Sequence, residues 1–460
     1  MKHYNKDLLI SFFDEIAHKK DYWHERNWFY HNKVHKLVSG FIPAGKSVLE
    51  IGCATGTLLA GLSAARGVGV DISSGMIKIA KEKYPDLEFI NADVMNLELL
   101  EKFDYIVLSE LTTTLFDVWK LFRKIEGWSH SNTMIIITAQ NPLWDMPIKL
   151  LEFLKLKQKS LRANGVFLGN LKNILNLAHF EVLNSKLYFF SMFGYIIAKP
   201  IKKYTKSDIS CSVIIPTRNE VGNIEECVKR MPNLANFTEL IFVDGDSTDG
   251  TVEEIKRIQR LFQGEKNIKL VHQKSTNADR NPNKMLQSGK GDAVRMGFEA
   301  ASGEILMILD SDLSVAPEDL PKFYCALSEG KAKFANGSRM IYPQEEGAMR
   351  FLNYLANKFF SAVFSWLLGQ HVSDTLCGTK AFFKKDYEKI KINRKHFGDF
   401  DPFGDFDLLF GASKLGLKTI DIPVRYYSRK YGKIKIERFK HGILLLKMSF
   451  VGFMKLKLKR

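Results

Sequence analysis

Short apolar runs alternate with longer segments of helical character along most of the chain. Runs of four or five residues rich in Val, Ile and Leu predict buried strands, and their alternation with helices predicts doubly wound parallel sheets. Two α/β domains are therefore expected. The predicted strands are residues 47–51, 67–70, 87–90, 105–108 and 134–138 in a first series, and 211–215, 240–243, 268–272 and 305–309 in a second.

A polar, lysine-rich stretch separates the two series. It contains Lys199-Pro200-Ile201-Lys202-Lys203, which predicts a linker. Ahead of the first series, residues 1–46 predict a helical lead-in rich in aromatic residues and histidine. The sequence is thus divided into a first domain at 1–195, a linker at 196–209, a second domain at 210–428 and a terminal segment at 429–460.

Residues 351–369 predict a mostly apolar helix. Asn353, Asn357, Ser361 and Ser365 recur every four residues and form one narrow polar stripe, whereas large apolar residues cover the rest. Such a helix is either buried in a core or lies in a membrane interface.

The composition is that of a globular protein with an excess of positive charge. Of 460 residues, 45% are hydrophobic and 26% are charged, which argues against long disorder. Lys and Arg outnumber Asp and Glu by 67 to 51, and the resulting charge of +16 implies an anionic partner. Eleven of these cations and one acid, Glu437, lie in residues 429–460, so this segment alone carries +10.

The terminal segment narrows the choice of partner. Its cations alternate with Ile, Leu, Phe and Met, which favours an anionic membrane surface over a nucleic-acid groove. No nucleic-acid partner is therefore expected, and a solvated charged tail is the alternative.

Three further features predict a cytoplasmic protein attached peripherally to the inner face of the cell membrane. Residues 1–20 carry charges throughout and lack the apolar core of a signal peptide. No run of 18 or more apolar residues predicts a spanning helix. The five cysteines lie far apart without metal-ligand spacing, which indicates a reducing compartment and no zinc site.

A glycine-containing loop follows the first predicted strand. Its pattern Glu50-x-Gly52-x-x-x-Gly56 supplies a sharp turn and lets the backbone approach a ligand closely. Asp71 ends the next strand, where it can accept hydrogen bonds from ribose hydroxyls, and Asp93 follows the third strand. The loop lacks the Gly-x-Gly-x-x-Gly pattern of pyrophosphate binding, which disfavours NAD.

The segment Val48-Leu49-Glu50-Ile51-Gly52-Cys53-Ala54-Thr55-Gly56 resembles the first motif of class I S-adenosylmethionine-dependent methyltransferases, and the resemblance covers about residues 25–185. It implies a Rossmann-like fold and S-adenosylmethionine as the cofactor. Ala54 stands where the family often has a third glycine. The implied cofactor-binding residues are Glu50, Gly52 and Gly56 of the loop, Asp71 at the ribose and Asp93 at the adenine amine.

Two carboxylates, Asp310 and Asp312, follow the last predicted strand. At positions i and i+2 of an extended segment they project to the same side, and such oxygen ligands suit Mg²⁺ or Mn²⁺ shared with a diphosphate. An isolated Asp-x-Asp is weak evidence, but three motifs precede it. In chain order these are Pro216-Thr217-Arg218-Asn219-Glu220, Asp244-Gly245-Asp246-Ser247 and Gly289-Lys290-Gly291-Asp292.

Together these motifs resemble the inverting GT-A glycosyltransferases that include the polyprenyl-phosphate mannosyl- and glucosyltransferases, over about residues 210–438. The resemblance implies a nucleotide-sugar donor and a polyprenyl phosphate or glycan acceptor. It continues through Asn336-Gly337-Ser338-Arg339 and the segments 374–380, 404–409 and 429–435, although Ile434 replaces the usual serine.

The resemblance also implies roles for individual residues. The implied metal ligands are Asp310 and Asp312; the nucleotide-sugar ligands are Pro216, Asn219, Glu220, Asp244, Lys290, Arg339, Arg429 and Lys435; and the catalytic candidates are Asp374, Lys380, Asp405 and Asp407. Displacing a nucleoside diphosphate develops negative charge, which a divalent ion and nearby cations would stabilise. A lipid phosphate acceptor needs no base, whereas a hydroxyl acceptor needs a carboxylate, for which Asp374 or Asp407 are the candidates.

The sequence therefore predicts an α/β protein of two doubly wound domains, an N-terminal Rossmann-like methyltransferase fold and a C-terminal GT-A fold, with a C-terminal amphipathic basic tail. The leading hypothesis is a metal-dependent, inverting glycosyltransferase that acts on a polyprenyl phosphate in bacterial surface glycan synthesis and is fused to an S-adenosylmethionine-dependent methyltransferase. The alternative is a glycosyltransferase that uses a sugar hydroxyl acceptor and carries a non-catalytic N-terminal binding domain.

Overall fold

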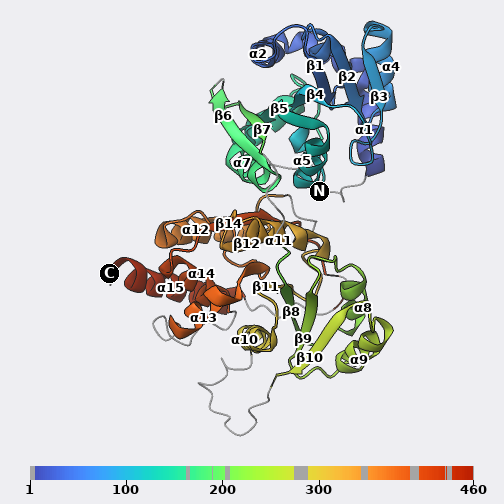
Figure 1. Cartoon of the computed structure of the whole chain (residues 1–460). Coiled ribbons are helices and arrows are strands. Elements are labelled where there is room, and N and C mark those ends of the chain that lie inside the picture. Colours follow the sequence, from blue (N-terminus) through green and yellow to red (C-terminus); the bar gives the residue numbers. More distant parts are fainter. Residues whose placement is uncertain are drawn as a thin grey trace. The chain divides into compact units, whose positions relative to one another are not determined.

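The computed structural model divides the chain into two compact units, residues 2–203 and 204–460 (Figure 1). Each unit is built around a seven-stranded sheet with helices, so the prediction of two α/β domains is confirmed. The structure describes residues 6–161, 166–188, 190–201, 208–273, 289–342, 351–393, 404–429, 431 and 438–458.

The sheet of the first unit has the strand order β3-β2-β1-β4-β5-β7-β6. Its strands are β1 (Ser47–Ile51), β2 (Arg66–Asp71), β3 (Glu88–Asn91), β4 (Phe103–Ser109), β5 (Ser129–Gln140), β6 (Phe180–Tyr188) and β7 (Phe193–Pro200). The helices of this unit are α1 (Lys6–Arg26), α2 (Trp28–Ser39), α3 (Thr57–Ala60), α4 (Ser74–Lys83), α5 (Val118–Gly127), α6 (Asp145–Phe153) and α7 (Leu168–Leu177). The central strands are buried almost throughout, as strands covered on both faces must be.

The first sheet is mixed and not parallel as predicted, because β7 runs antiparallel to both β5 and β6. Only residues 189–192 separate β6 from β7, and a connection this short can join antiparallel strands but not parallel ones. β7 also includes the first residues of the predicted linker 196–209. Ile196, Ile197 and Ala198 are buried and pair with β5, so residues 196–200 form a strand where a linker was expected.

The second sheet has the order β10-β9-β8-β11-β13-β12-β14. Only β13 is antiparallel to its neighbours, so this sheet is also mixed. Its strands are β8 (Cys211–Thr217), β9 (Thr238–Asp244), β10 (Asn267–His272), β11 (Ile305–Ile308), β12 (Phe334–Ser338), β13 (Lys380–Phe383) and β14 (Thr419–Pro423). The helices are α8 (Val221–Lys229), α9 (Thr251–Leu261), α10 (Lys290–Ala300), α11 (Leu320–Ser328), α12 (Phe351–Leu368), α13 (Lys384–Asn393), α14 (Asp405–Lys414) and α15 (Arg438–Phe453).

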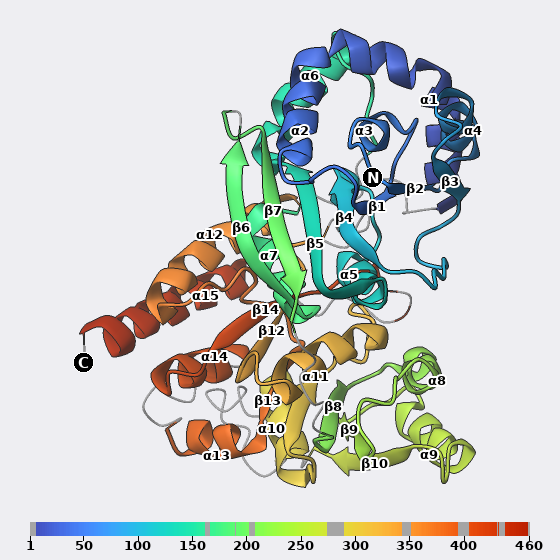
Figure 2. The ribbon, with the colours of Figure 1, turned by 45° about the horizontal axis from the view of Figure 1, so that its top comes forward.

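The predicted apolar helix is α12, and α15 of the terminal segment lies beside it (Figure 2). Three residues of the predicted polar stripe of α12 face the protein, because Asn357 is buried and Ser361 and Ser365 donate to the carbonyl oxygen of Val372 at 2.6 Å and 3.2 Å. The side chain of Asn353 lies outside the described ones. The terminal segment is not a separate tail, since Leu445 and Met448 of α15 belong to the core of the second unit.

Candidate active sites

Both predicted sites lie where the strand order of a sheet reverses. In the first sheet the order reverses between β1 and β4, and in the second between β8 and β11. In open α/β sheets, ligands bind outside the carboxyl ends of the strands at such a point. The glycine loop follows β1 and the Asp310–Asp312 pair follows β11, so the topology places both motifs where ligands are expected.

A cavity of about 430 Å³ lies at the point where the strand order of the first sheet reverses, which we call its switch point. Gly52, Asp71 and Asp93 line it, as the sequence predicted for cofactor ligands. Gly52 has a φ of 78°, and a Cβ atom there would lie 2.8 Å from the Cδ1 of Leu111. The loop can therefore take this path only with glycine at this position.

The lining of this cavity does not include Glu50 or Gly56. Glu50 is buried and accepts a hydrogen bond from the backbone N–H of Leu59 at 3.1 Å, and burial raises the pKa of this carboxyl to about 8. Gly56 has a φ of 76°, and a Cβ atom there would lie 2.6 Å from the ring of Phe89. Both residues therefore shape the loop without lining the cavity.

The two aspartates that line the cavity are already hydrogen-bonded. Asp71 accepts backbone N–H bonds from Ala54 and Ser73, each at 2.9 Å, and burial raises the pKa of Asp71. Asp93 pairs with Lys6 of α1 at 2.7 Å. These contacts fix both carboxylates at the edge of the cavity.

The helical lead-in covers the cofactor loop, a feature that sequence reasoning missed. Asp14 of α1 accepts hydrogen bonds from the Ser73 hydroxyl at 2.6 Å and the Gly75 N–H at 2.9 Å. Asp21 accepts one from Thr55 at 2.7 Å. These hydrogen bonds hold α1 against the loop after β1 and the segment after β2, both of which border the cavity.

A second contact that the sequence did not reveal joins α2 to the end of β4. The hydroxyl of Tyr30 donates to the carboxylate of Glu110, and both residues line the cavity. Glu110 has a φ of 57°, which is uncommon for a residue with a side chain. Its position after β4, at the switch point, is the signal that could have identified it.

At the switch point of the second sheet, the two predicted metal ligands are paired with cations. Lys290 Nζ lies 2.5 Å from Asp310 Oδ1, and Arg429 Nη2 lies 2.6 Å from Asp312 Oδ2. Burial opposes the charge of Lys290, but Asp310, Asp405 and Asp312 together raise its pKa above the ordinary value. Burial also opposes the charge of Asp310, but Lys290, Arg429 and Lys380 lower its pKa.

The space beside this pair is kept open by a glycine. A Cβ atom on Gly378 would lie 2.6 Å from Asp310 Oδ2. Any larger residue at position 378 would therefore displace the metal-ligand candidate.

Four predicted nucleotide ligands lie at the ends of β8 and β9 or directly after them. Pro216 accepts a hydrogen bond through its carbonyl from the hydroxyl of Ser311, at 2.9 Å. Asn219 Oδ1 accepts the N–H of Thr248 at 2.8 Å, and Glu220 Oε2 accepts from Asn223 at 2.7 Å. The Oδ1 atom of Asp244 is buried and has no hydrogen-bond partner among the described residues, so it can accept from a ligand.

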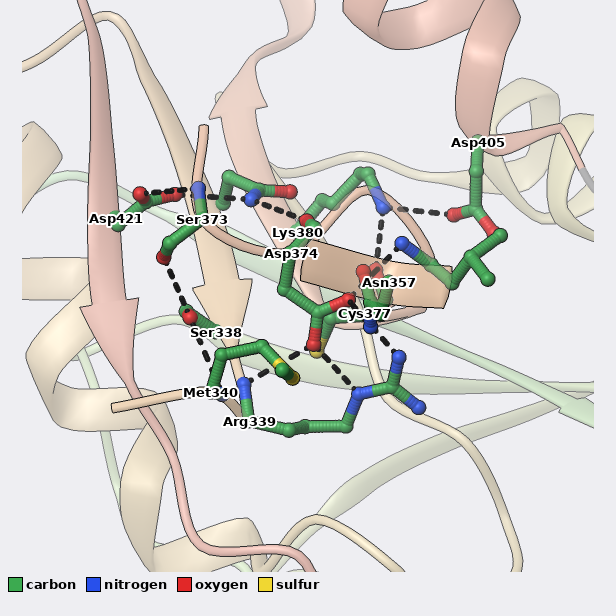
Figure 3. Close-up of polar contacts among 12 residues, drawn as sticks. Ser338, Arg339, Met340, Asn357, Ser373, Asp374, Cys377, Lys380, Asp405 and Asp421 are labelled. Carbon is green, nitrogen blue, oxygen red and sulfur yellow. Dashed lines mark hydrogen bonds and ion pairs between the residues drawn. The ribbon is translucent and has the colours of Figure 1, made fainter. Parts of the chain in front are cut away.

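Arg339 and Asp374 form a buried bidentate pair (Figure 3). Arg339 donates through Nε at 2.7 Å and Nη2 at 2.9 Å, and Asn357 of α12 donates to the same carboxylate at 3.0 Å. Asp374 also accepts the backbone N–H of Leu376 at 3.0 Å. Burial would raise the pKa of Asp374, but Arg339 and Asn357 lower it to about 2.

Lys380 is fully buried and binds Asp405 at 2.7 Å and the carbonyl oxygen of Cys377 (Figure 3). Asp405 and Asp407 lie in the first turn of α14. Arg295 Nη1 lies 3.8 Å from Asp407 Oδ2. Lys435 lies outside the described residues.

Two family models match the chain. Residues 48–128 match the model described as "Methyltransferase domain", and residues 212–391 match "Glycosyl transferase family 2". The chain joins a methyltransferase domain to a family 2 glycosyltransferase domain. This confirms both resemblances inferred from the sequence.

The glycosyltransferase domain is similar to several proteins of known name. The dolichol-phosphate mannosyltransferase of Pyrococcus furiosus is 28% identical over 233 residues, which are 49% of this chain and 59% of that protein. The polyprenol monophosphomannose synthase of Mycolicibacterium smegmatis is 25% identical over 230 residues, 49% of this chain and 80% of that protein. The chain spans 59%, 64% and 36% of the length of the first three curated relatives.

The methyltransferase domain is similar to solved structures at low sequence identity. A S-adenosylmethionine-dependent methyltransferase from Thermotoga maritima is 16% identical, with a TM-score of 0.35, and the match covers 41% of this chain and 98% of that chain.

The glycosyltransferase domain gathers alternating charges around one point. Asp310, Lys290, Lys380 and Asp405 interact electrostatically with one another, and Arg429 approaches from the segment after β14. A site of this kind can neutralise a diphosphate with its cations while its carboxylates hold a cation of their own.

Proposed function

We propose that the glycosyltransferase domain transfers a sugar, with inversion, from a nucleotide-sugar donor to a polyprenyl phosphate. The observation that carries this proposal is the Asp310–Asp312 pair with its two cations, Lys290 and Arg429, at the switch point of the sheet. Relatives named for transfer to dolichol phosphate and polyprenol phosphate support the same acceptor.

A Mg²⁺ or Mn²⁺ ion fits the donor set of this site. Asp310 and Asp312 supply hard oxygen ligands, and a donor diphosphate would complete the coordination. In the described part of the chain, His, Cys, Asp and Glu side chains do not gather in groups of three or more that could hold a metal ion without such a ligand. When bound, the ion would supply positive charge at the leaving diphosphate.

Other residues of the chain would bind the diphosphate and the nucleoside of the donor. Lys290 and Arg429, released from their carboxylates, would bind diphosphate oxygens, and the unpartnered oxygen of Asp244 would accept from the nucleoside. Pro216, Asn219 and Glu220 border the same end of the sheet and would contact the nucleotide.

The environments of the catalytic candidates favour an acceptor that is already ionised. Asp374 is held ionised by Arg339 with its pKa at about 2, so it is a weak proton acceptor and would instead orient Arg339 towards phosphate. In the same way, Asp405 would orient the ammonium group of Lys380. A sugar hydroxyl acceptor remains the second candidate, with Asp407, in the first turn of α14, as its base.

The glycosyltransferase domain would attach to an anionic membrane through α12 and α15. Phe359 and Trp366 of α12 and Phe450 of α15 are 58–63% exposed, and Lys457 lies 5.4 Å from the ring of Trp366. Among the described residues, no helix combines the length and apolarity needed to cross a membrane. We propose peripheral attachment on the inner face of the cell membrane, and a role in bacterial surface glycan synthesis.

The methyltransferase domain would bind S-adenosylmethionine in the cavity that Gly52, Asp71 and Asp93 line. The competing proposal, a non-catalytic binding domain, predicts that the cavity binds no such cofactor. Isothermal titration with S-adenosylmethionine separates these two cases.

Labelled nucleotide sugars test the glycosyltransferase proposal. Membranes that hold the chain should transfer label to material extracted by organic solvent, and an Asp312→Ala variant should lose this transfer by at least about a hundredfold, as removal of a group that stabilises developing charge does. Asp208→Ala, at an exposed position, is the matched control. Full transfer by Asp312→Ala would contradict the metal assignment, and label confined to water-soluble glycan would establish the hydroxyl acceptor.

A further inference from the structure

The segment that follows β5 exposes an unusual amount of apolar surface on the methyltransferase domain. We define the α6 rim as residues 143–161, which include α6. Met146 is 78% exposed and Phe153 is 81% exposed. Other large apolar side chains of the rim that are exposed include Leu143, Leu150, Leu154 and Leu156.

These residues do not belong to the core of the domain. α6 anchors itself through Ile148, which is 3% exposed. The opposite side of the helix and the residues after it turn leucine, methionine and phenylalanine side chains to the solvent. Burying a side chain of this kind is worth about 1.5–3 kcal/mol, so a contiguous set left in water marks a contact surface.

The charges of the α6 rim select the partner. Lys149, Lys155 and Lys159 are exposed among the apolar side chains, and Asp145 is the acid in the first turn of α6. Glu152 is turned towards its own segment, where it accepts from Ser160 at 2.5 Å and lies 4.0 Å from Lys157. An apolar face bordered by lysines matches the acyl boundary and anionic headgroups of a lipid surface.

The α6 rim is continuous with the cavity of the domain. Ile148 and Leu151 of α6, and Lys157, Lys159 and Leu161 after it, line that cavity. The segment that would touch lipid therefore also supplies residues to the wall of the proposed cofactor site.

We propose that the α6 rim seats the methyltransferase domain on an anionic lipid surface, and that the methyl acceptor reaches the cavity from that surface as a lipid-carried molecule. The contact is separate from the one proposed for α12 and α15, because it lies in the other compact unit. The statement about the acceptor rests on the proposed methyltransferase function, whereas the docking does not.

A polarity-sensitive fluorophore on the full-length chain tests the docking. The label is attached to Met146→Cys, and the unsubstituted protein gives the background of the native cysteines, of which four are buried. The emission should shift to the blue with vesicles that contain phosphatidylglycerol and should not shift with pure phosphatidylcholine. Leu261→Cys on α9, 55% exposed in the other domain, is the matched control and should not respond.

Two outcomes of the labelling overturn the docking. One is an unresponsive Met146→Cys label under conditions in which a Trp366→Cys label shifts. The other is emission that is already blue-shifted without vesicles, because the α6 rim would then be covered by protein.

A double variant tests the acceptor. Met146→Ser with Phe153→Ser should lower transfer of labelled methyl groups to solvent-extractable product by roughly tenfold or more, as the loss of two apolar contacts implies. S-adenosylmethionine binding should stay unchanged, because neither residue lines the cavity. Methyl label found only in water-soluble product, at equal rates in both proteins, overturns the acceptor assignment. If the unsubstituted chain binds no S-adenosylmethionine, the proposed methyltransferase function fails and the docking result stands on its own.

Discussion

Individual residues of the glycosyltransferase domain form buried or partly buried pairs of opposite charge. The pairs of Lys290 with Asp310, Arg339 with Asp374 and Lys380 with Asp405 each join residues from different segments of the chain. Placing two charges in a protein interior costs solvation free energy, and loss of one partner leaves the other charge uncompensated. Substitution of a single partner will therefore affect stability as well as activity.

Asp374→Asn should destabilise the glycosyltransferase domain by about 3–5 kcal/mol, because it removes the carboxylate charge that pairs with the buried guanidinium of Arg339. The free energy of unfolding measured in urea checks this. Asp208→Asn, at an exposed position, should change that free energy by less than about 0.5 kcal/mol. Equal stability of the two variants would show that Arg339 finds another partner.

Glu50 should make the methyltransferase domain less stable as the pH rises. Its folded pKa of about 8 lies above the ordinary value of 4.5, so between these values the folded state binds the extra proton. Stability should therefore fall as the pH rises from about 5 to 8, and Glu50→Gln should remove a few kcal/mol of this dependence. Thermal unfolding followed across this pH range measures the effect, and identical slopes for both proteins would contradict it.

At the scale of elements, α15 combines two roles that the sequence could not separate. Leu445 and Met448 are buried in the core, while Leu446 and Phe450 are about 60% exposed. The helix therefore holds the fold together with one side and offers apolar surface with the other.

Leu445→Ala should cost about 2–5 kcal/mol of unfolding free energy, because it leaves a cavity in the core. Leu446→Ala, one residue further along and 58% exposed, is the matched control and should be nearly neutral in solution. The free energies of unfolding of the two variants, measured in denaturant, test this prediction. Similar small losses in both would mean that α15 is only a surface attachment.

Elements with a strong local pattern were predictable, and those that depend on distant contacts were not. β1 and β8 carry apolar runs that predict strands without any tertiary information. β12 contains Asn336-Gly337-Ser338 and is buried only because its neighbours cover it. The α1 contact between Asp14 and Ser73 joins residues 59 positions apart, a distance that no sequence pattern specifies.

The same limit applies to the candidate sites. The sequence identified Asp310, Asp312, Lys290 and Arg429 singly, because each stands in a recognisable motif. Which cation pairs with which carboxylate depends on the fold, as the contact between Arg429 and Asp312 shows. Glu110 carries no motif at all, and only its place at the end of β4 indicates a role.

For the molecule as a whole, the division into two compact units places the proposed methyl transfer and the proposed sugar transfer in different units. A ligand that binds one unit should stabilise that unit alone, by about 2.7 kcal/mol at a concentration one hundred times its Kd. S-adenosylmethionine should raise the midpoint of one thermal transition, and a nucleoside diphosphate with Mn²⁺ should raise the midpoint of the other. Calorimetry of the full-length chain measures both shifts, and a single transition that responds to each ligand would contradict this independence.

At the proposed metal site, the ion pair between Arg429 and Asp312 would compete with cation binding. A metal ion that binds Asp312 must displace a guanidinium that is tethered to the same polypeptide and so is present at high effective concentration. The carboxylate pair will therefore bind a bare divalent ion weakly. Affinity should appear only when a diphosphate arrives to accept Arg429, so that metal and donor bind together in an ordered, mutually dependent way.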